Sequence, residues 1–82
     1  MREYYYKPKA EENLAGLKAL DDVDTINDAV KALAAGKKRG YLIPLQSPFL
    51  KKNQILYQYV VGRYKLNYTL TRKELNVESV MV

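Results

Sequence analysis

The segment from Tyr64 to Leu70 constrains the fold of this chain more than any other stretch. Apolar or aromatic side chains occupy every second position (Tyr64, Leu66, Tyr68 and Leu70), and polar side chains lie between them (Lys65, Asn67 and Thr69). Successive side chains of a β-strand point to opposite faces, so this period of two predicts a strand with one buried and one polar face. The buried face needs a second layer to cover it.

Other segments predict the rest of the sheet, namely Glu3–Lys7, Tyr41–Leu45, Ile55–Val61 and Leu75–Val82. Gly62-Arg63 predicts a tight turn, so the last three strands form an antiparallel meander. In the final strand, strict alternation places Leu75, Val77, Ser79 and Met81 on one face. Pro44 indicates that the segment Tyr41–Leu45 forms an edge strand or a bulge.

Two helical patterns lie between the first and second predicted strands. The first runs from Lys9 to Leu20, and the second is expected to begin at an N-cap residue, Asp24 or Thr25, and to end at Gly36. The fold class is therefore α+β, a single domain over residues 1–82 with the order β-α-α-β-β-β-β. We expect a helical hairpin packed on one face of an antiparallel sheet.

The absence of two residue types excludes several kinds of site. The chain has no histidine and no cysteine. Disulfide frameworks, thiolate metal sites and nucleophiles activated by histidine are therefore excluded. The cluster of Asp21, Asp22 and Asp24 lacks the other ligands of a calcium loop and is expected to cap a helix. We expect no metal site and no cofactor.

The sequence also predicts a cytoplasmic protein. No apolar run approaches the roughly 18–20 residues needed to span a bilayer, so no membrane association is expected. The first residues, Met1–Tyr6, lack the apolar core and the cleavage site of a signal peptide.

Charge is divided unevenly along the chain. Residues 1–36 contain five basic and seven acidic side chains, whereas residues 37–82 contain nine basic and two acidic ones. This asymmetry favours a basic face that binds a polyanion or an acidic partner. The alternative is a charge excess that only increases solubility.

Basic and aromatic residues are interleaved in the second half of the chain. Aromatic rings can stack on bases while cations neutralise phosphates. Tyr64 and Tyr68 share a face with leucines and are predicted to lie in the core, whereas Tyr57 and Tyr59 are predicted to be more open. The candidate nucleic-acid-binding residues are Tyr57, Tyr59, Lys37, Lys38, Arg39, Lys51 and Lys52.

The segment Val61–Tyr68 resembles the "hydrophobic–Gly–x–Tyr–Arg–hydrophobic–x–Tyr" segment of the RelE/ParE superfamily of toxins from toxin–antitoxin pairs. The predicted element order is similar as well. The resemblance implies a RelE-like fold, an RNA or ribosome target, and a protein antitoxin as partner. Members that are ribonucleases cleave without a metal, so Lys65 and Arg63 would be the catalytic cations, facing the substrate together with Tyr57 and Tyr59. Active members usually carry Lys or Arg where this chain has Gln58 and Val60.

Three functions are compatible with the sequence. The first is a RelE/ParE-like toxin or toxin-derived protein that acts on translation, RNA or another nucleic-acid machine. It would be either a metal-independent endoribonuclease or a relative without catalysis. The second is a basic, non-enzymatic nucleic-acid-binding module. The third is an interaction protein that binds an acidic protein surface or forms a homodimer through Leu75–Val82, if that strand is an open edge.

Overall fold

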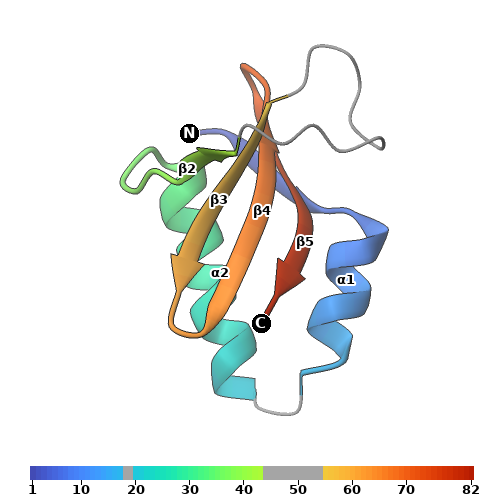
Figure 1. Ribbon diagram of the computed structural model, residues 1–82. Helices are drawn as coiled ribbons and strands as arrows, with labels where there is room; N and C mark the ends of the chain where they lie inside the picture. Colours follow the sequence, from blue (N-terminus) through green and yellow to red (C-terminus); the bar gives the residue numbers. More distant parts are fainter. Residues whose placement is uncertain (18–19, 44–54) are drawn as a thin grey trace.

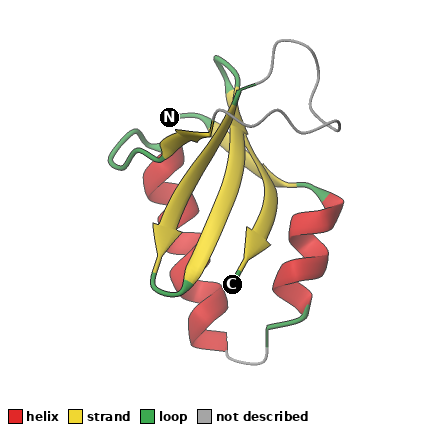
Figure 2. Cartoon of the chain, viewed as in Figure 1, coloured by secondary structure: helices red, strands yellow, loops and turns green. Residues whose placement is uncertain are grey.

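The computed structural model describes residues 1–17, 20–43 and 55–82 of the 82-residue chain. The elements are, in chain order, β1 (Glu3–Tyr6), α1 (Pro8–Ala15), α2 (Leu20–Ala34), β2 (Tyr41–Ile43), β3 (Leu56–Val61), β4 (Tyr64–Leu70) and β5 (Glu74–Met81). Figure 1 shows α2 crossing behind the sheet and α1 beside β5. The predicted α+β class and element order are confirmed, with both helices packed on one five-stranded sheet (Figure 2).

The strand order is β1-β5-β4-β3-β2, and the sheet is mixed. β1 pairs in parallel with β5, whereas the other pairs are antiparallel, so the expectation of a wholly antiparallel sheet is wrong for this strand. Two neighbouring parallel strands need a long connection between them. In the chain, both helices and the strands β2 to β4 lie between β1 and β5, so β5 can run alongside β1 in the same direction.

The last strand is not an open edge, contrary to the expectation for Leu75–Val82. β1 pairs with β5 over Glu74–Val77. Further along, Asn13 on α1 accepts a hydrogen bond from the Val80 backbone N–H at 3.0 Å. Among the described strands, the edges are β1 and β2.

A bulge at Glu78 interrupts the alternation of β5. Tyr68 lies opposite Val77 and Asn67 lies opposite Ser79, so Glu78 has no partner on β4. An extra residue reverses which face the following side chains take. Val80 is therefore buried with Val77, while the amide of Asn67 donates hydrogen bonds to Ser79 and Met81 on the other face. The expectation that Ser79 and Met81 share the face of Leu75 and Val77 is wrong for this reason.

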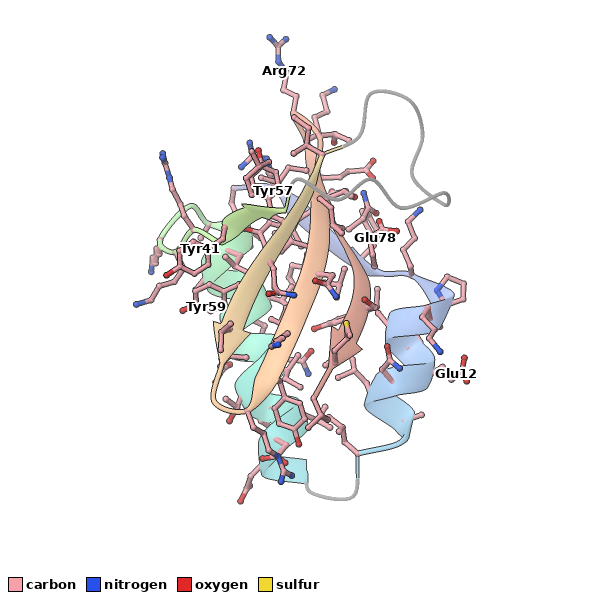
Figure 3. All side chains as sticks on the ribbon, in the orientation of Figure 1. Glu12, Tyr41, Tyr57, Tyr59, Arg72 and Glu78 are labelled. Atoms are coloured by element: carbon pink, nitrogen blue, oxygen red, sulfur yellow. The ribbon has the colours of Figure 1, made fainter. Side chains whose placement is uncertain are left out.

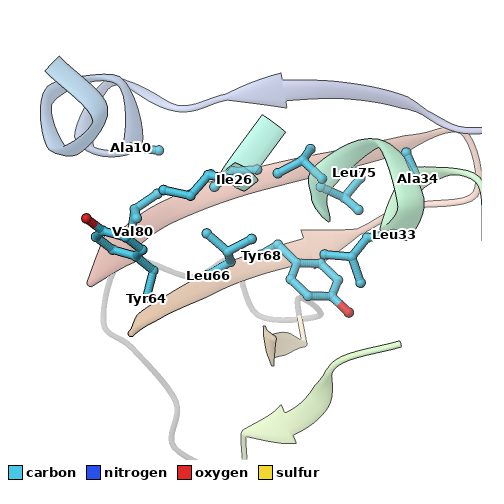
Figure 4. Packing of buried hydrophobic residues seen from close by; sticks show 11 residues of the cluster. Ala10, Ile26, Leu33, Ala34, Tyr64, Leu66, Tyr68, Leu75 and Val80 are labelled. Atoms are coloured by element: carbon cyan, nitrogen blue, oxygen red, sulfur yellow. The ribbon is translucent and has the colours of Figure 1, made fainter. Parts of the chain in front are cut away.

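The core lies between the sheet and the two helices (Figure 4). Its central row is Tyr64, Leu66 and Tyr68 on β4, as the sequence predicts, with each side chain at most 4% exposed. The helices contribute the residues Ala10, Ile26, Val30, Leu33 and Ala34. None of the described helices is long and apolar enough to cross a membrane.

The helix boundaries differ from the sequence expectation at two points: the first helix ends at Ala15 rather than at Leu20, and the second begins before Asp24. α1 begins at Pro8 and ends at Ala15, and α2 already begins at Leu20, so neither Asp24 nor Thr25 is its N-cap. Asp21 and Asp22 lie in the first turn of α2, where negative charge is favourable against the helix dipole. The end of α2 agrees with the prediction, because Gly36 has a φ of 77° and follows the last turn.

Candidate functional site

Six basic side chains gather where three segments meet, and we call this region the basic end. The three segments are the start of β1, the connection from α2 to β2 and the β4–β5 turn. The basic residues are Arg2, Lys37, Lys38, Arg39, Arg72 and Lys73. Figure 3 shows Arg72 projecting away from the rest of the molecule at this end. Charges from both halves of the sequence are thus brought together by the fold.

Backbone hydrogen bonds join the three segments. The Arg2 N–H donates to the Ala34 carbonyl at 3.0 Å, which ties the start of β1 to the end of α2. The Glu3 N–H donates to the Lys73 carbonyl, also at 3.0 Å, which ties β1 to the β4–β5 turn. The α2 end is closed because the N–H groups of Gly36 and Lys37 bond back to carbonyls of the last helical turn. Backbone hydrogen bonds therefore hold the three segments of the basic end together.

Several hollows open at or beside the basic end, and two of them are lined by three cations each. The first has a volume of about 280 Å³, and we call it the Arg2 pocket. It is lined by Arg2, Leu33, Gly36, Lys38, Arg39, Gly40, Tyr57, Tyr68 and Leu70. Among the described residues, its lining includes three cations and no carboxylate. The neighbouring hollow, of about 570 Å³, also contains Arg2, but its lining includes Glu3 and Glu74. The Arg2 pocket is therefore the one suited to an anion.

Two tyrosine rings form the sheet side of the Arg2 pocket. Tyr57 on β3 and Tyr68 on β4 are stacked, with ring centroids 5.5 Å apart and an angle of 20° between the ring planes. The Tyr68 hydroxyl accepts a hydrogen bond from the Gly40 N–H at 2.9 Å. Burial raises the pKa of Tyr68, an effect that the nearby Arg2 partly opposes. The Tyr68 hydroxyl is thus neutral at physiological pH.

Gly40 fits between the sheet and Tyr68 with no room for a side chain. A Cβ atom at this position would lie 2.6 Å from the Gln58 carbonyl oxygen and 2.7 Å from the Tyr68 hydroxyl oxygen. The loop can therefore approach the sheet this closely only because residue 40 is glycine. This close approach holds the backbone of Lys38 and Arg39 beside the two rings.

Six of the seven predicted binding residues divide into three groups. Lys38, Arg39 and Tyr57 all line the Arg2 pocket. Lys37 lies at the same end but lines a different hollow, with Met1 and Tyr4. Lys51 and Lys52 lie outside the described residues.

Sequence reasoning missed Arg2 and Tyr68 as members of this site. Tyr68 is correctly predicted as a core residue, yet its hydroxyl end reaches the pocket. Arg2 is distant in sequence from every other lining residue, and no local pattern connects it with them. Arg2 reaches the pocket because β1, which begins at the next residue, pairs with β5.

The predicted shared surface of Tyr57, Tyr59 and Lys65 is wrong. In the β3–β4 register, Tyr57 lies opposite Tyr68 and Tyr59 lies opposite Leu66. Directly paired residues of an antiparallel sheet point to the same face, so both tyrosines lie on the helix-covered face. Lys65 is exposed on the opposite face, paired with Val60 and Met81.

Arg63 is engaged on the helix side rather than beside Lys65. Its guanidinium forms an ion pair with Asp22 of α2 at 3.3 Å and donates to the Tyr64 hydroxyl at 3.0 Å. The Tyr64 hydroxyl itself donates to Asp22 at 2.6 Å. The hydrogen bond to Tyr64, with the charge of Asp22 adding to it, raises the pKa of Arg63. The two predicted catalytic cations do not converge, and their catalytic role stays a prediction.

No family model matches the sequence, and no curated protein matches it either.

Within the described part of the chain, no group of three or more Asp and Glu side chains is placed to hold a metal ion. The chemistry that the described residues of the basic end offer is anion binding by Arg and Lys beside an aromatic surface.

Proposed function

We propose that this protein binds single-stranded nucleic acid, and RNA in particular, at the basic end in the cytoplasm. The observation that carries the proposal is the Arg2 pocket, in which the described lining residues include three cations and two tyrosines and no carboxylate. Cations neutralise phosphates, and aromatic rings stack on the bases of a single strand. An acidic protein partner would satisfy the cations but would make no specific use of the aromatic ring.

The arrangement of the remaining charges supports the same proposal. Arg72 and Lys73 extend the basic end beyond the pocket and line the adjoining hollow with Arg2. The acidic first turn of α2, with Asp21 and Asp22, lies at the opposite end of that helix. A polyanion is therefore attracted to one end of the molecule, which orients its approach.

Binding of a single-stranded RNA of about ten nucleotides, followed by fluorescence anisotropy at several salt concentrations, tests the proposal. Each neutralised phosphate of a single strand contributes a slope of about −0.7 to the dependence of log K on log salt. The double variant Arg72→Ala/Lys73→Ala should weaken binding and make the slope shallower by about 1.4. Lys9→Ala is the matched control, because this exposed cation lies on α1, and it should bind as the unmodified protein does. Absence of binding at moderate salt would reject the proposal.

A RelE/ParE-like toxin, or a protein derived from one, is the second candidate function. The observation that favours it is the element order with two helices packed on the sheet, which agrees with the resemblance of Val61–Tyr68 to that superfamily. The proposed target is messenger RNA on the ribosome, and an antitoxin would be the partner. Because Arg63 is paired with Asp22, the geometry supports RNA binding better than catalysis.

Expression in bacteria separates the two candidates. A toxin arrests growth, and a ribonuclease toxin cleaves ribosome-bound messenger RNA in the same cells. Lys65→Ala would slow cleavage by roughly 10²–10³-fold if Lys65 stabilises the scissile phosphate, because the barrier would rise by about 3–4 kcal/mol. Normal growth together with intact messenger RNA would remove the toxin candidate and leave the binding function.

A further inference from the structure

We infer that the Arg2 pocket binds a nucleoside phosphomonoester, that is, a terminal phosphate together with the nucleoside attached to it. The inference rests on the proposed function and specifies which part of the nucleic acid enters the pocket. A strand end and a free nucleotide share this chemistry, and the experiments below distinguish them.

The size of the pocket favours a single terminal group over a continuous strand. Its volume of about 280 Å³ lies just below the range for small-molecule sites, which is roughly 300–1,000 Å³. It is the more enclosed of the two neighbouring hollows, bounded by the α2 end, by the loop through Gly40 and by β3 and β4. A strand that continued in both directions would fit better along the wider hollow.

The charges in the pocket match a monoester better than an internal diester. A phosphomonoester carries about −1.5 to −2 charges at pH 7, because its second pKa is near 6. An internal diester carries a single charge. Arg2, Lys38 and Arg39 face the pocket together, and within the described part of the chain none of them forms an ion pair with a carboxylate. Three unpaired cations are more than one monoanion requires.

Arg2 is held in place before any ligand arrives. Its Nε donates to the Thr71 carbonyl at 2.9 Å, and its backbone N–H bonds to Ala34. The two terminal nitrogens of the guanidinium are then left to contact a phosphate, whose oxygens suit the planar, bidentate geometry of arginine. Fixing the side chain in advance lowers the entropy cost of binding.

The base would lie against Tyr57. The Tyr57 ring is half-buried, lines the pocket and is held in orientation by its stack on Tyr68. The Tyr68 hydroxyl already accepts the Gly40 N–H and can still donate its own proton to a phosphate oxygen. The pocket thus offers cations for the phosphate and an aromatic ring for the base.

Three RNA oligonucleotides of one sequence test the inference, carrying a 5′-phosphate, a 3′-phosphate or hydroxyl groups at both ends. With an internal fluorescent label, one phosphorylated form should bind at least about tenfold tighter than the hydroxyl form. A second arm uses uridine 5′-monophosphate and uridine, followed by the amide NMR signals of Gly36 and Gly40. The monophosphate should shift these signals at concentrations where uridine does not.

Variants then assign the effect to the pocket. Arg39→Ala and Tyr57→Ala should each remove most of the preference for the phosphorylated end. Arg72→Ala is the matched control, because Arg72 lies at the basic end but not in the Arg2 pocket; it should weaken all three oligonucleotides by the same factor.

The possible outcomes test the phosphomonoester inference and the proposed binding of single-stranded nucleic acid separately. Salt-dependent binding with equal affinity for the three oligonucleotides would overturn the inference and leave the proposed function standing. A preference that persists in Arg39→Ala and Tyr57→Ala would overturn the assignment to this pocket. Signal shifts with the monophosphate, but no oligonucleotide binding, would support the pocket as a free-nucleotide site and reject the proposed function. No response to any probe would reject both.

Discussion

Replacing Gly40 by alanine is expected to destabilise the protein strongly, although Gly40 lies in a loop. The added Cβ would lie 2.6 Å from the Gln58 carbonyl oxygen and 2.7 Å from the Tyr68 hydroxyl oxygen. Ordinary contact begins at about 3.4 Å, so the loop has to move by roughly 0.8 Å. That movement strains the hydrogen bond from the Gly40 N–H to Tyr68.

The expected cost follows from these two effects. Overpacking a tight site costs about 1–3 kcal/mol, and a lost hydrogen bond costs about 0.5–1.5 kcal/mol. The free energy of unfolding should therefore fall by about 1.5–4.5 kcal/mol. A chain of 82 residues is expected to have a total stability of about 4–12 kcal/mol, so the loss is a large fraction of it.

Urea unfolding followed by circular dichroism measures the effect, and Gly16→Ala is the matched control. Gly16 has right-handed helical backbone angles, and a Cβ there would make only ordinary contacts, the nearest at 3.5 Å. Alanine at that position should leave stability unchanged or raise it by about 0.4–1 kcal/mol. If Gly40→Ala unfolds at the same urea concentration as the unmodified protein, the close packing of this loop on Tyr68 is refuted.

Three further predictions concern two hydrogen bonds and one titrating tyrosine elsewhere in the fold. Tyr64→Phe removes the bond to Asp22 and should lower the free energy of unfolding by about 1–2 kcal/mol, measured by urea unfolding. Asn13→Ala removes the acceptor of the Val80 N–H, so this amide should exchange faster with deuterium. Burial, with the nearby Tyr4 adding to it, raises the pKa of Tyr6 to about 12. Stability linked to Tyr6 is thus complete below pH 10 and is lost between about pH 10 and 12, and Tyr6→Phe should reduce this loss.

The predictable part of the fold depends on short-range patterns. The alternation in Tyr64–Leu70 identifies the central strand and its buried face, because the period of two acts within a single segment. Gly36 marks the end of α2 since its φ of 77° suits glycine best. The start of α2 is harder to predict, because aspartates are favourable both as N-caps and in the first turn.

The candidate site could be predicted only in part, because it depends on long-range pairing. Lys38, Arg39 and Tyr57, which line the pocket, are predicted from local patterns: a basic run before a short strand, and tyrosines interleaved with cations. Their convergence with Arg2 requires β1 to lie beside β5, which no pattern within β1 specifies. The faces of Tyr57 and Tyr59 depend on the register of β3 against β4, since a shift by one residue exchanges the two faces of a strand.

Deletion of the bulge residue Glu78 tests whether the apolar pattern of β5 sets its register against β4. Without Glu78, strict alternation would place Leu75, Val77 and Val80 on one face, and their present partners on β4 would be unchanged. Deletion of Glu78 should therefore leave the sheet intact. The main cost is the loss of the hydrogen bond from the Thr69 hydroxyl to Glu78. The Thr69 hydroxyl is then left without this partner, in a residue that is only 1% exposed. Leaving a buried polar group without a partner costs about 1–3 kcal/mol.

Deletion of Asn76 is the matched control, because it also shortens β5 by one residue. It would make Leu75 and Val77 neighbours, so one of two fully buried side chains would have to leave the core. Removing one large aliphatic side chain from a core costs about 2–5 kcal/mol. Urea unfolding should therefore show a much larger loss for the Asn76 deletion, and Thr69→Val should recover part of the loss in the Glu78 deletion. Equal losses in the two deletions would show that the apolar pattern does not set the register, because only one of them breaks that pattern.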